Sequence, residues 1–336
     1  MKLALGAFAL LVAGALAMLL AGVNPAAGYF QLLRGALGNE HHLAETLVQT
    51  TALLFPSLGV AFAFRAGLFN IGAEGQLVVG GLCAGLLGAA LPGGALAIGA
   101  MLVAGALGGA AWGGIAGAIR ARFGSSEVIA TLMLNVIAAL LANYLVSGPL
   151  HSPAALGNET AELPVASWLP LLLPGTRLTI ALPLALALAL GLRWFFARTV
   201  LGYELRAAGE APDAARRAGI DPARVALGAM SVSGAIAGLG GATIVAGILH
   251  RFDVALGPGY GFIAIAVALV GRLDPLWIVL AAFAFGILQS GSLSMQAYAH
   301  VPKDVVTVIE GLAILALAAQ PALTRRAAAG ATESAA

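Results

Sequence analysis

Long apolar stretches, each close to the length of a membrane-spanning helix, recur along almost the whole chain. A helix needs about 20 mainly apolar residues to cross the hydrocarbon core of a bilayer. Ten stretches meet or approach this length, at residues 3–23, 47–64, 71–91, 95–119, 127–147, 177–196, 225–249, 259–271, 276–294 and 303–320. The stretch 259–271 is too short to cross as a regular helix, and 71–91 opens on a polar, Gly-rich run at residues 70–76. The pattern therefore predicts an all-α integral membrane protein with about ten transmembrane helices, one or two of them broken or re-entrant.

Composition favours lipid over water as the solvent. Only 10% of the residues are charged and 60% are hydrophobic, whereas roughly 25% of the residues in a soluble domain are charged. A water-soluble surface built from so few charges would be one continuous apolar patch. The net charge of +2 gives no indication of nucleic-acid binding. The apolar run 3–23 exceeds the roughly 7–15 residues of a signal peptide's core, so we interpret it as a retained first helix.

Positive charge is distributed unevenly between the two sides that ten spans define. If the N-terminus is cytoplasmic, thirteen of the 17 Lys and Arg residues fall in inside segments, and the other four, Arg34, Arg177, Arg251 and Lys303, fall outside. Inside loops of membrane proteins carry the excess of basic residues. We therefore expect the N- and C-termini to be cytoplasmic, with residues 1–326 forming a single transmembrane domain and 327–336 a disordered cytoplasmic tail.

Two stretches between the predicted spans are longer than a connection requires. Residues 148–176 form a proline-rich outside loop, and residues 197–224 form the longest cytoplasmic loop. Within the latter, Pro212 suits a first helical position, Asp213 suits the positive end of the helix dipole, and Gly219 suits the stop. We expect a short amphipathic helix over 212–218 that lies along the cytoplasmic face. The alternative is that 197–224 is a solvated connector.

The sequence lacks motifs for catalysis and for nucleotide binding. There is no G-x-x-x-x-G-K-[ST] loop, and the only lysines are Lys2 and Lys303, neither in such a context. The chain therefore cannot hydrolyse ATP by the P-loop route. If ATP drives its function, the ATP is bound by a partner, and the chain itself is expected to hold no cofactor. No H-E-x-x-H or G-x-S-x-G motif occurs either, so enzymatic activity has no support.

One polar cluster resembles a metal site only superficially. It contains Glu40, His41, His42 and Glu45, in the predicted first outside loop. The spacing matches no established ligand pattern, and the adjacent His41 and His42 would point apart on a helix. We interpret the cluster as a solvated loop and predict no metal site.

Polar side chains inside the predicted spans are the candidates for solute contact, because such groups are costly in lipid and usually face a cavity or the bundle interior. The candidates for the substrate path are Asn70, Glu74, Gln76, Asn135, Asn143 and Gln289, and Glu310 is a further carboxyl within a span. Asn135 and Asn143 are eight residues apart, so on a helix they share a face and would offer amides to a polar, uncharged solute. The alternative is that the amides bond backbone groups at kinks and that Glu74 bonds groups freed by a broken helix.

Glycine recurs every four residues in the stretch 95–119, at Gly105, Gly109, Gly113 and Gly117. This spacing places the glycines on one helix face and permits close contact with another helix. Gly234 and Gly238 repeat the spacing in the stretch 225–249. The pattern predicts helix packing and carries no information about the solute.

Four strings of sequence resemble one family of membrane proteins. They are residues 64–76 (FRAGLFNIGAEGQ), 127–135 (EVIATLMLN), 206–220 (RAAGEAPDAA, then GI at its end) and 271–275 (GRLDP). In this order they resemble the permease subunits of simple-sugar and nucleoside ATP-binding-cassette (ABC) importers, within the branched-chain amino acid and ribose permease family. The resemblance covers nearly the whole chain, and GLFNIGAEGQ is similar to the nucleoside branch. Ala211 is a departure, since the family pattern leads us to expect Asn there.

The resemblance implies an assembly in the bacterial cytoplasmic (inner) membrane. Its parts are two membrane subunits, identical or homologous, two cytoplasmic ABC ATPases and an extracytoplasmic solute-binding protein. The resemblance further implies that the ATPase contacts the cytoplasmic loop at Glu204, Arg206, Gly209, Glu210, Asp213, Ala214, Ala215, Gly219 and Ile220. Movement of these residues would expose a central path alternately to either side of the membrane.

Three classes of transport function remain to be compared. The ABC permease is favoured by the four strings. An ion-coupled secondary transporter would share broken helices but needs buried ion-coupling carboxylates, for which only Glu74 and Glu310 qualify. A passive channel has no distinctive feature here. A nucleoside, in particular a purine nucleoside, is the predicted solute, with a monosaccharide such as ribose or galactose second and a branched-chain amino acid third.

Overall fold

The computed structural model describes residues 12–153, 157–257 and 259–302, together with residues 305, 307, 308 and 311. These residues form helices, and within them no β-strand occurs beyond two isolated bridges. Seven helices are long and apolar enough to cross a membrane, or eight if one bent pair counts as a span. The all-helical membrane class is confirmed, but ten spans are not reached in the described part of the chain. Most of the stretch 303–320, with Glu310, and the tail 327–336 lie outside the described residues.

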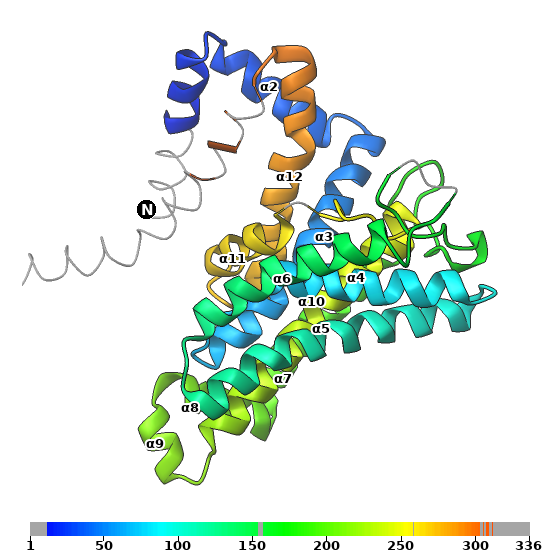
Figure 1. Ribbon diagram of the computed structural model, residues 1–336. Helices are drawn as coiled ribbons and strands as arrows, with labels where there is room; N and C mark the ends of the chain where they lie inside the picture. The colour runs from blue at the N-terminus through cyan, green and yellow to red at the C-terminus, as the bar shows by residue number, and fades with distance from the viewer. Residues whose placement is uncertain are drawn as a thin grey trace, which may run out of the picture. The chain divides into compact units, whose positions relative to one another are not determined.

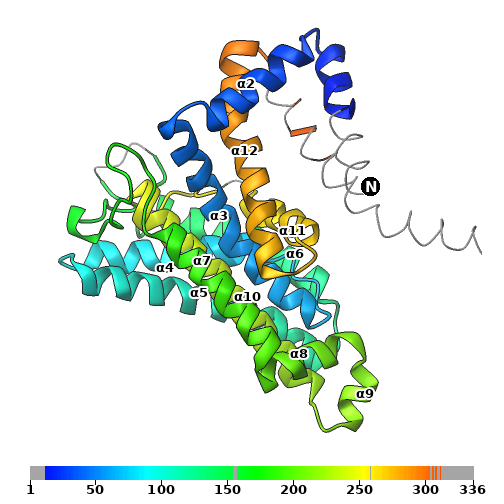
Figure 2. The same ribbon diagram turned by 180° about the vertical axis from the view of Figure 1, so that it is seen from behind.

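The described chain divides into two compact units. The terminal unit combines Met1–Thr46 with Ala284–Ala336, and the central unit is Leu47–Phe283. Two helices, α3 (Glu40–Arg65) and α12 (Pro275–Ala299), contribute residues to both units. Figures 1 and 2 label the helices from opposite sides.

The start of the terminal unit differs from the prediction. The helical residues Val12–Leu20 are followed by a second helix, α2 (Pro25–Leu37), and the pair is bent by 114°. The side-chain oxygen of Asn24 accepts a hydrogen bond from Ala26 N at 2.9 Å, and Pro25 suits the first helical position. Within the predicted stretch 3–23, Val12–Leu20 is helical and residues 3–11 lie outside the described residues, whereas the loop expected after this stretch contains α2 instead. The cluster Glu40, His41, His42 and Glu45 likewise lies on the first turns of α3 and not in a loop.

The central unit is built mainly from the helices that follow α3. They are α4 (Ala73–Ala90), α5 (Ala95–Phe123), α6 (Glu127–Ser147), α7 (Ala181–Arg198), α8 (Val200–Glu210), α9 (Pro212–Arg217), α10 (Pro222–Ile244) with the π-helical turn η2 (Val245–Leu249), and α11 (Tyr260–Val270). The bounds of α6 equal those of the predicted stretch 127–147. The bounds of α4, α5, α7, the α10–η2 pair and α11 agree with the predicted stretches to within about one helical turn.

Three helices, α4, α5 and α10, form the core of the central unit by packing backbone against backbone. The glycine row of α5, Gly105, Gly109, Gly113 and Gly117, is buried on the face that contacts α10. A Cβ atom added at Gly109 would collide with the carbonyl oxygen of Gly234, and one added at Gly238 would collide with that of Gly105. The absence of side chains lets these helices approach closely, as helices embedded in lipid do.

The chain between η2 and α11 returns along α4. Phe252 lies over Gly85, where an added Cβ would be 2.8 Å from the Phe252 Cβ, and Leu256 lies over Gly81, 3.1 Å from an added Cβ. α11 then begins where Gly261 contacts the backbone of Glu74. With 11 residues, α11 is shorter than a full span. This half-length helix agrees with the predicted broken or re-entrant element.

The predicted outside loop 148–176 is fastened to the turn that follows η2. Leu163 N donates to the His250 carbonyl oxygen at 2.8 Å, and Arg251 forms an ion pair with Glu159 at 2.7 Å. The Trp168 ring stacks on the His250 ring with centroids 3.7 Å apart. These contacts hold the loop against the end of α10.

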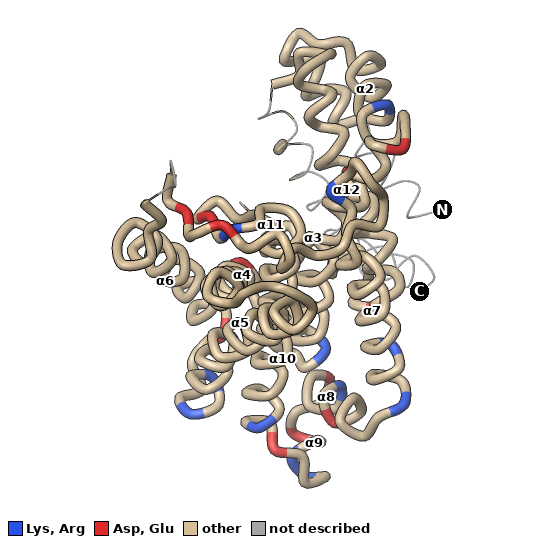
Figure 3. The backbone as a smooth tube through the Cα atoms, turned by 90° about the vertical axis from the view of Figure 1, so that its right-hand side faces the viewer, with Lys and Arg blue, Asp and Glu red and all other residues tan. Residues whose placement is uncertain are grey.

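The stretch 197–224 contains more helix than predicted. Its predicted helix over 212–218 is confirmed as α9, after which Gly219 takes a left-handed conformation with φ of 86°. α8 was not predicted; the Thr199 side chain starts it by accepting a hydrogen bond from Gly202 N at 3.0 Å. Figures 1 and 2 show α8 and α9 together at one end of the central unit. Most of the Arg residues of that unit lie at the same end (Figure 3).

Candidate functional site

The link between α3 and α4, residues 66–72, carries non-helical backbone into the interior of the central unit. Asn70 is fully buried at its centre. The Asn70 Nδ2 donates to Gln76 Oε1 at 2.9 Å and to Ser233 Oγ of α10 at 2.7 Å. The Asn70 Oδ1 accepts from Gly72 N at 2.9 Å, and Ser233 donates onward to the Gly59 carbonyl oxygen at 2.6 Å. Non-helical backbone at membrane depth needs such partners within the protein, and these side chains supply them.

One face of α6 follows the link. Glu127, Thr131 and Asn135 are spaced four residues apart and are all buried. The Asn135 Nδ2 donates to the Ile71 carbonyl oxygen at 2.8 Å, and its Oδ1 accepts from Gly75 N at 2.9 Å. One amide side chain therefore satisfies backbone groups on both sides of the first residue of α4.

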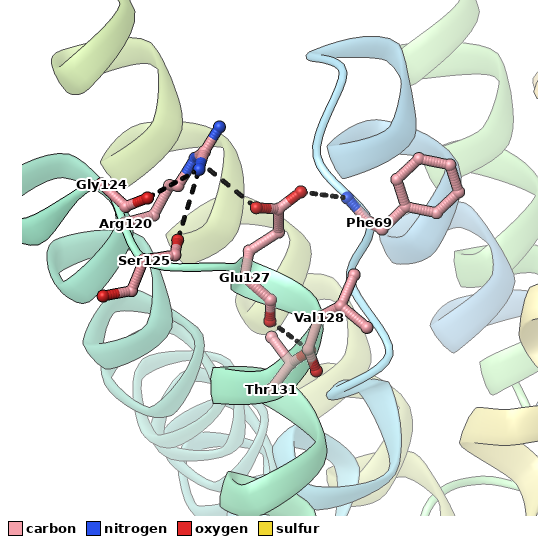
Figure 4. Close-up of polar contacts among 7 residues, drawn as sticks. All are labelled: Phe69, Arg120, Gly124, Ser125, Glu127, Val128 and Thr131. Carbon is pink, nitrogen blue, oxygen red and sulfur yellow. Dashed lines mark hydrogen bonds and ion pairs between the residues drawn. The ribbon is translucent and has the colours of Figure 1, made fainter.

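At the other end of this face, Glu127 joins three segments of chain (Figure 4). Its Oε1 accepts from Phe69 N in the link at 3.4 Å, and its Oε2 lies 3.5 Å from Nε of Arg120. Arg120 also donates to the carbonyl oxygens of Gly124 and Ser125, which directly follow α5, at 3.1 and 3.3 Å. Glu127 thus ties both the end of α5 and the start of α6 to the link.

Glu74, in the first turn of α4, bonds the start of α11. Its two carboxylate oxygens accept from Gly259 N at 3.0 Å and from Gly261 N at 2.6 Å. The first N–H groups of a helix have no intrahelical acceptor and form the positive end of its dipole, so a carboxylate is a favourable partner there. Glu74 therefore bonds backbone N–H groups left free at a helix end, as the structural alternative for this residue proposed. The helix concerned is α11 and not α4.

The remaining predicted path residues have different surroundings. Asn143 is exposed, and its Oδ1 accepts from Asn158 Nδ2 of the outside loop at 3.0 Å. It therefore does not share the buried environment of Asn135, and solute contact by the two amides stays a prediction. Gln289 is half-buried on the part of α12 that belongs to the terminal unit. Of the predicted set, the structure brings Asn70, Glu74, Gln76 and Asn135 to the link and the start of α4.

The link also touches α8 and the turn before α12. Gly209, in the last turn of α8, lies so close to Gly67 that a Cβ added at Gly209 would be 2.7 Å from Gly67 N. At the start of the link, Arg65 Nε donates to the Leu273 carbonyl oxygen at 2.8 Å. The strings 127–135, 206–220 and 271–275 therefore all contact the string 64–76. The four segments that carry the family resemblance meet at one place.

The residues predicted to contact an ATPase lie on α8, α9 and the turn after them. A cleft of about 540 Å³ opens between these elements, and five of the predicted residues line it: Arg206, Glu210, Ala214, Ala215 and Ile220. Glu210, Asp213, Ala214 and Gly219 are exposed, Glu204, Arg206, Gly209 and Ile220 are half-buried, and Ala215 is buried. The set thus combines an accessible rim with residues that face the rest of the unit.

Comparison with known sequences decides the family. Residues 42–318 match the family described as branched-chain amino acid transport system / permease component. The chain belongs to this permease family. Several curated relatives are also similar to the permease over most of its length. No solved structure matches it.

Three of these relatives are permease proteins of named ABC transporters. The permease is 38% identical to the guanosine ABC transporter permease protein NupP of Bacillus subtilis, over 93% of this chain and 91% of the relative. It is 33% identical to the nucleoside ABC transporter permease protein NupB of Lactococcus lactis, over 91% and 86%. It is 34% identical to the glucose ABC transporter permease protein TsgB13 of Haloferax volcanii, over 92% and 84%.

Two residues of the site were not identified from the sequence. Glu127 opens the string 127–135, and an acidic residue at the start of a predicted span is a signal that was available. Ser233 carries no such signal, because a serine in an apolar stretch commonly bonds its own helix. Its contact with Asn70 joins residues 163 positions apart and is visible only in the fold.

Proposed function

We propose that the permease is the membrane-spanning subunit of an ABC importer that carries a purine nucleoside across the bacterial cytoplasmic membrane. The observation that carries the solute assignment is its identity of 38% and 33% to permeases named for guanosine and nucleoside transport, over nine-tenths of the chain. The geometry supports the same class of transporter, because the four family strings converge on a buried link that the α8 helix contacts directly.

The proposal assigns the work of ATP hydrolysis to a partner. A cytoplasmic ABC ATPase binds ATP and contacts α8 and α9, whose cleft and exposed Glu210 and Asp213 provide an accessible surface. The basic residues at this end support its cytoplasmic location (Figure 3). Cytoplasmic N- and C-termini stay a prediction. The permease itself is non-catalytic and holds no cofactor. A second permease subunit and an extracytoplasmic solute-binding protein complete the assembly, with residues 1–326 acting as one permease domain and 327–336 as its tail.

Direct solute contact stays a prediction for Asn70, Glu74, Gln76, Asn135, Asn143 and Gln289. For Asn70, Gln76 and Asn135 the hydrogen bonds support the structural alternative, in which the amides hold the link in shape. Both oxygens of Glu74 are likewise engaged by backbone N–H groups of α11. That engagement weakens the case for an ion-coupled secondary transporter, which would need a carboxylate free to bind the coupling ion.

A monosaccharide is the second candidate solute. The identity of 34% to a glucose transporter permease of Haloferax volcanii, over 92% of this chain, is close to the identity with the nucleoside permeases. Overall identity favours the nucleoside, at 38% for the guanosine permease against 34% for the glucose permease, and a binding measurement decides between the two solutes.

The experiment is calorimetric titration of the solute-binding protein encoded beside this permease with guanosine, adenosine, inosine, ribose, galactose and glucose. We expect tight binding of at least one purine nucleoside and no binding of the free sugars. Binding of a sugar alone would replace the nucleoside assignment and leave the importer assignment in place. The lack of any neighbouring ATPase and binding protein would contradict the importer assignment itself.

A further inference from the structure

The contact between α8 and the α3–α4 link is made by two backbones. A Cβ at Gly209 would lie 2.5 Å from the Arg65 carbonyl oxygen and 2.7 Å from Gly67 N. A Cβ at Gly67, whose φ is 73°, would lie 3.0 Å from the Gly209 Cα. Side chains accommodate small shifts by changing rotamer, but a close-packed pair of backbones has no such freedom. Any displacement of α8 toward the link therefore moves the link.

The link is held just as firmly on its far side. Phe69 N is bonded by Glu127, and Ile71 O and Gly75 N are bonded by Asn135, both from α6. Asn70 is bonded by Ser233 of α10. The link therefore cannot shift alone, because a movement of Gly67 must either break these hydrogen bonds or carry α6, α10 and the start of α4 with it.

The start of α4 is in turn attached to α11. Gly261 of α11 lies against the backbone of Glu74, and the Glu74 carboxylate accepts hydrogen bonds from the first N–H groups of α11. A displaced α4 start thus takes the half-length helix α11 with it. A continuous series of contacts runs from α8, through the link, to α11.

We propose that the contact of Gly209 with Gly67 is the joint through which α8 moves the link, α4 and α11 during transport, and that Gly209 is a positioning residue for this step. The proposal rests on the proposed function, since it takes α8 and α9 as the surface on which the ATPase acts. It requires that Gly209 acts without touching solute or nucleotide. Loss of the joint then lowers the amount of solute transported per ATP hydrolysed.

The first test uses the unmodified transporter, purified with its ATPase, and measures amide hydrogen exchange with and without a non-hydrolysable ATP analogue. We expect exchange in α8 and in residues 68–75 to change together, by about fivefold or more, the lower end of typical coupling between sites. A change in α8 without any change in 68–75 would overturn the joint. Unchanged exchange in α8 would contradict the proposed function, and the joint with it.

The second test compares Gly209→Ala with Gly228→Ala, a control glycine in α10 whose added Cβ would meet no atom within 4 Å. In proteoliposomes, Gly209→Ala is expected to lower the amount of solute taken up per ATP hydrolysed by about tenfold, within the usual range of allosteric coupling, whatever its effect on the ATPase rate itself. Gly228→Ala is expected to retain the normal amount. A normal amount of solute per ATP in an assembled Gly209→Ala transporter would overturn the proposal. If that variant does not assemble, the exchange measurement on the unmodified transporter still decides.

Discussion

Asn135 of α6 accepts a hydrogen bond from the backbone N–H of Gly75 at 2.9 Å, and the same side chain donates to the carbonyl oxygen of Ile71 at 2.8 Å. The two backbone groups lie on either side of the point at which the extended link becomes α4. The amide therefore stabilises the junction between non-helical and helical backbone, where intrahelical hydrogen bonding is incomplete. The stability of this junction depends on a side chain from another helix.

Replacement of Asn135 by alanine is expected to destabilise the permease. Two buried backbone groups lose their partners at a cost of about 1–3 kcal/mol each, so the total is about 2–6 kcal/mol. The measurement is thermal unfolding of the detergent-solubilised protein. Asn143→Ala is the matched control on the same helix, because Asn143 is exposed, and it should change stability by less than about 0.5 kcal/mol. Equal effects of the two variants would refute the role given to Asn135.

The backbone contact between α5 and α10 predicts a large difference between two glycines of α5. A Cβ at Gly109 collides with the Gly234 carbonyl oxygen, whereas one at Gly99 meets no atom within 4 Å. Gly109→Ala is expected to lower the free energy of unfolding by about 1–3 kcal/mol through overpacking. Gly99→Ala should leave it unchanged or raise it by up to about 1 kcal/mol through helix propensity. Unfolding curves of the two variants test this, and a tolerated Gly109→Ala would show that the helices are not in contact there.

Glu74→Gln tests the bond between α4 and α11. Glutamine retains one acceptor oxygen and loses the negative charge at the helix N-terminus, so we expect a loss of about 1–2 kcal/mol in stability. Hydrogen exchange should rise at the first amides of α11. Glu162→Gln is the control, because the Glu162 side chain is 57% exposed. Unaltered exchange in α11 would mean that other contacts fix its start.

Protonation of His250, which contacts the loop 148–176 through Leu163 and Trp168, is expected to make the stability of the protein depend on pH. Burial against Trp168 lowers the pKa of His250 below its usual 6.5, with Arg251 acting in the same direction and Glu162 and a backbone hydrogen bond to Ala246 opposing it. The unfolded chain then binds the proton more tightly than the folded protein, so this contribution to stability is lost as pH falls below about 6.5. The measurement is the melting temperature of the wild type and of His250→Asn from pH 8 to pH 5. As pH falls, the melting temperature of the wild type should decrease more than that of the variant. Asparagine is chosen because it tolerates the positive φ of this position. Parallel curves would contradict the prediction.

Much of the fold follows from local pattern. The stretch 127–147 has the same bounds as α6, because a serine and an acidic residue precede a long apolar run and a glycine ends it. α2 was missed because its residues 25–37 mix apolar and polar types and were interpreted together with the polar cluster at Glu40 as one loop. α8 was missed because Gly202 and Gly209 weaken its helical propensity, while its packing depends on both: Gly209 lies against the link and Gly202 against Phe195 and Phe196 of α7.

The site was only partly predictable, because its contacts are long-range. The strings near Asn70 and Asn135 were recognised as candidates, but periodicity along α6 paired Asn135 with Asn143, whereas the fold pairs it with the link. The roles of Ser233 and Gly67 depend on neighbours far away in the sequence. A local pattern indicates which face of a helix is buried, but not which segment covers it.

The most direct test of the central claim is uptake of radiolabelled guanosine by proteoliposomes that contain the whole transporter, with its binding protein supplied outside. The account predicts that guanosine accumulates only when hydrolysable ATP reaches the ATPase, and that a non-hydrolysable analogue or omission of the ATPase abolishes accumulation. Accumulation that proceeds without ATP, driven by a sodium or proton gradient, would show that the permease is not the membrane subunit of an ABC importer.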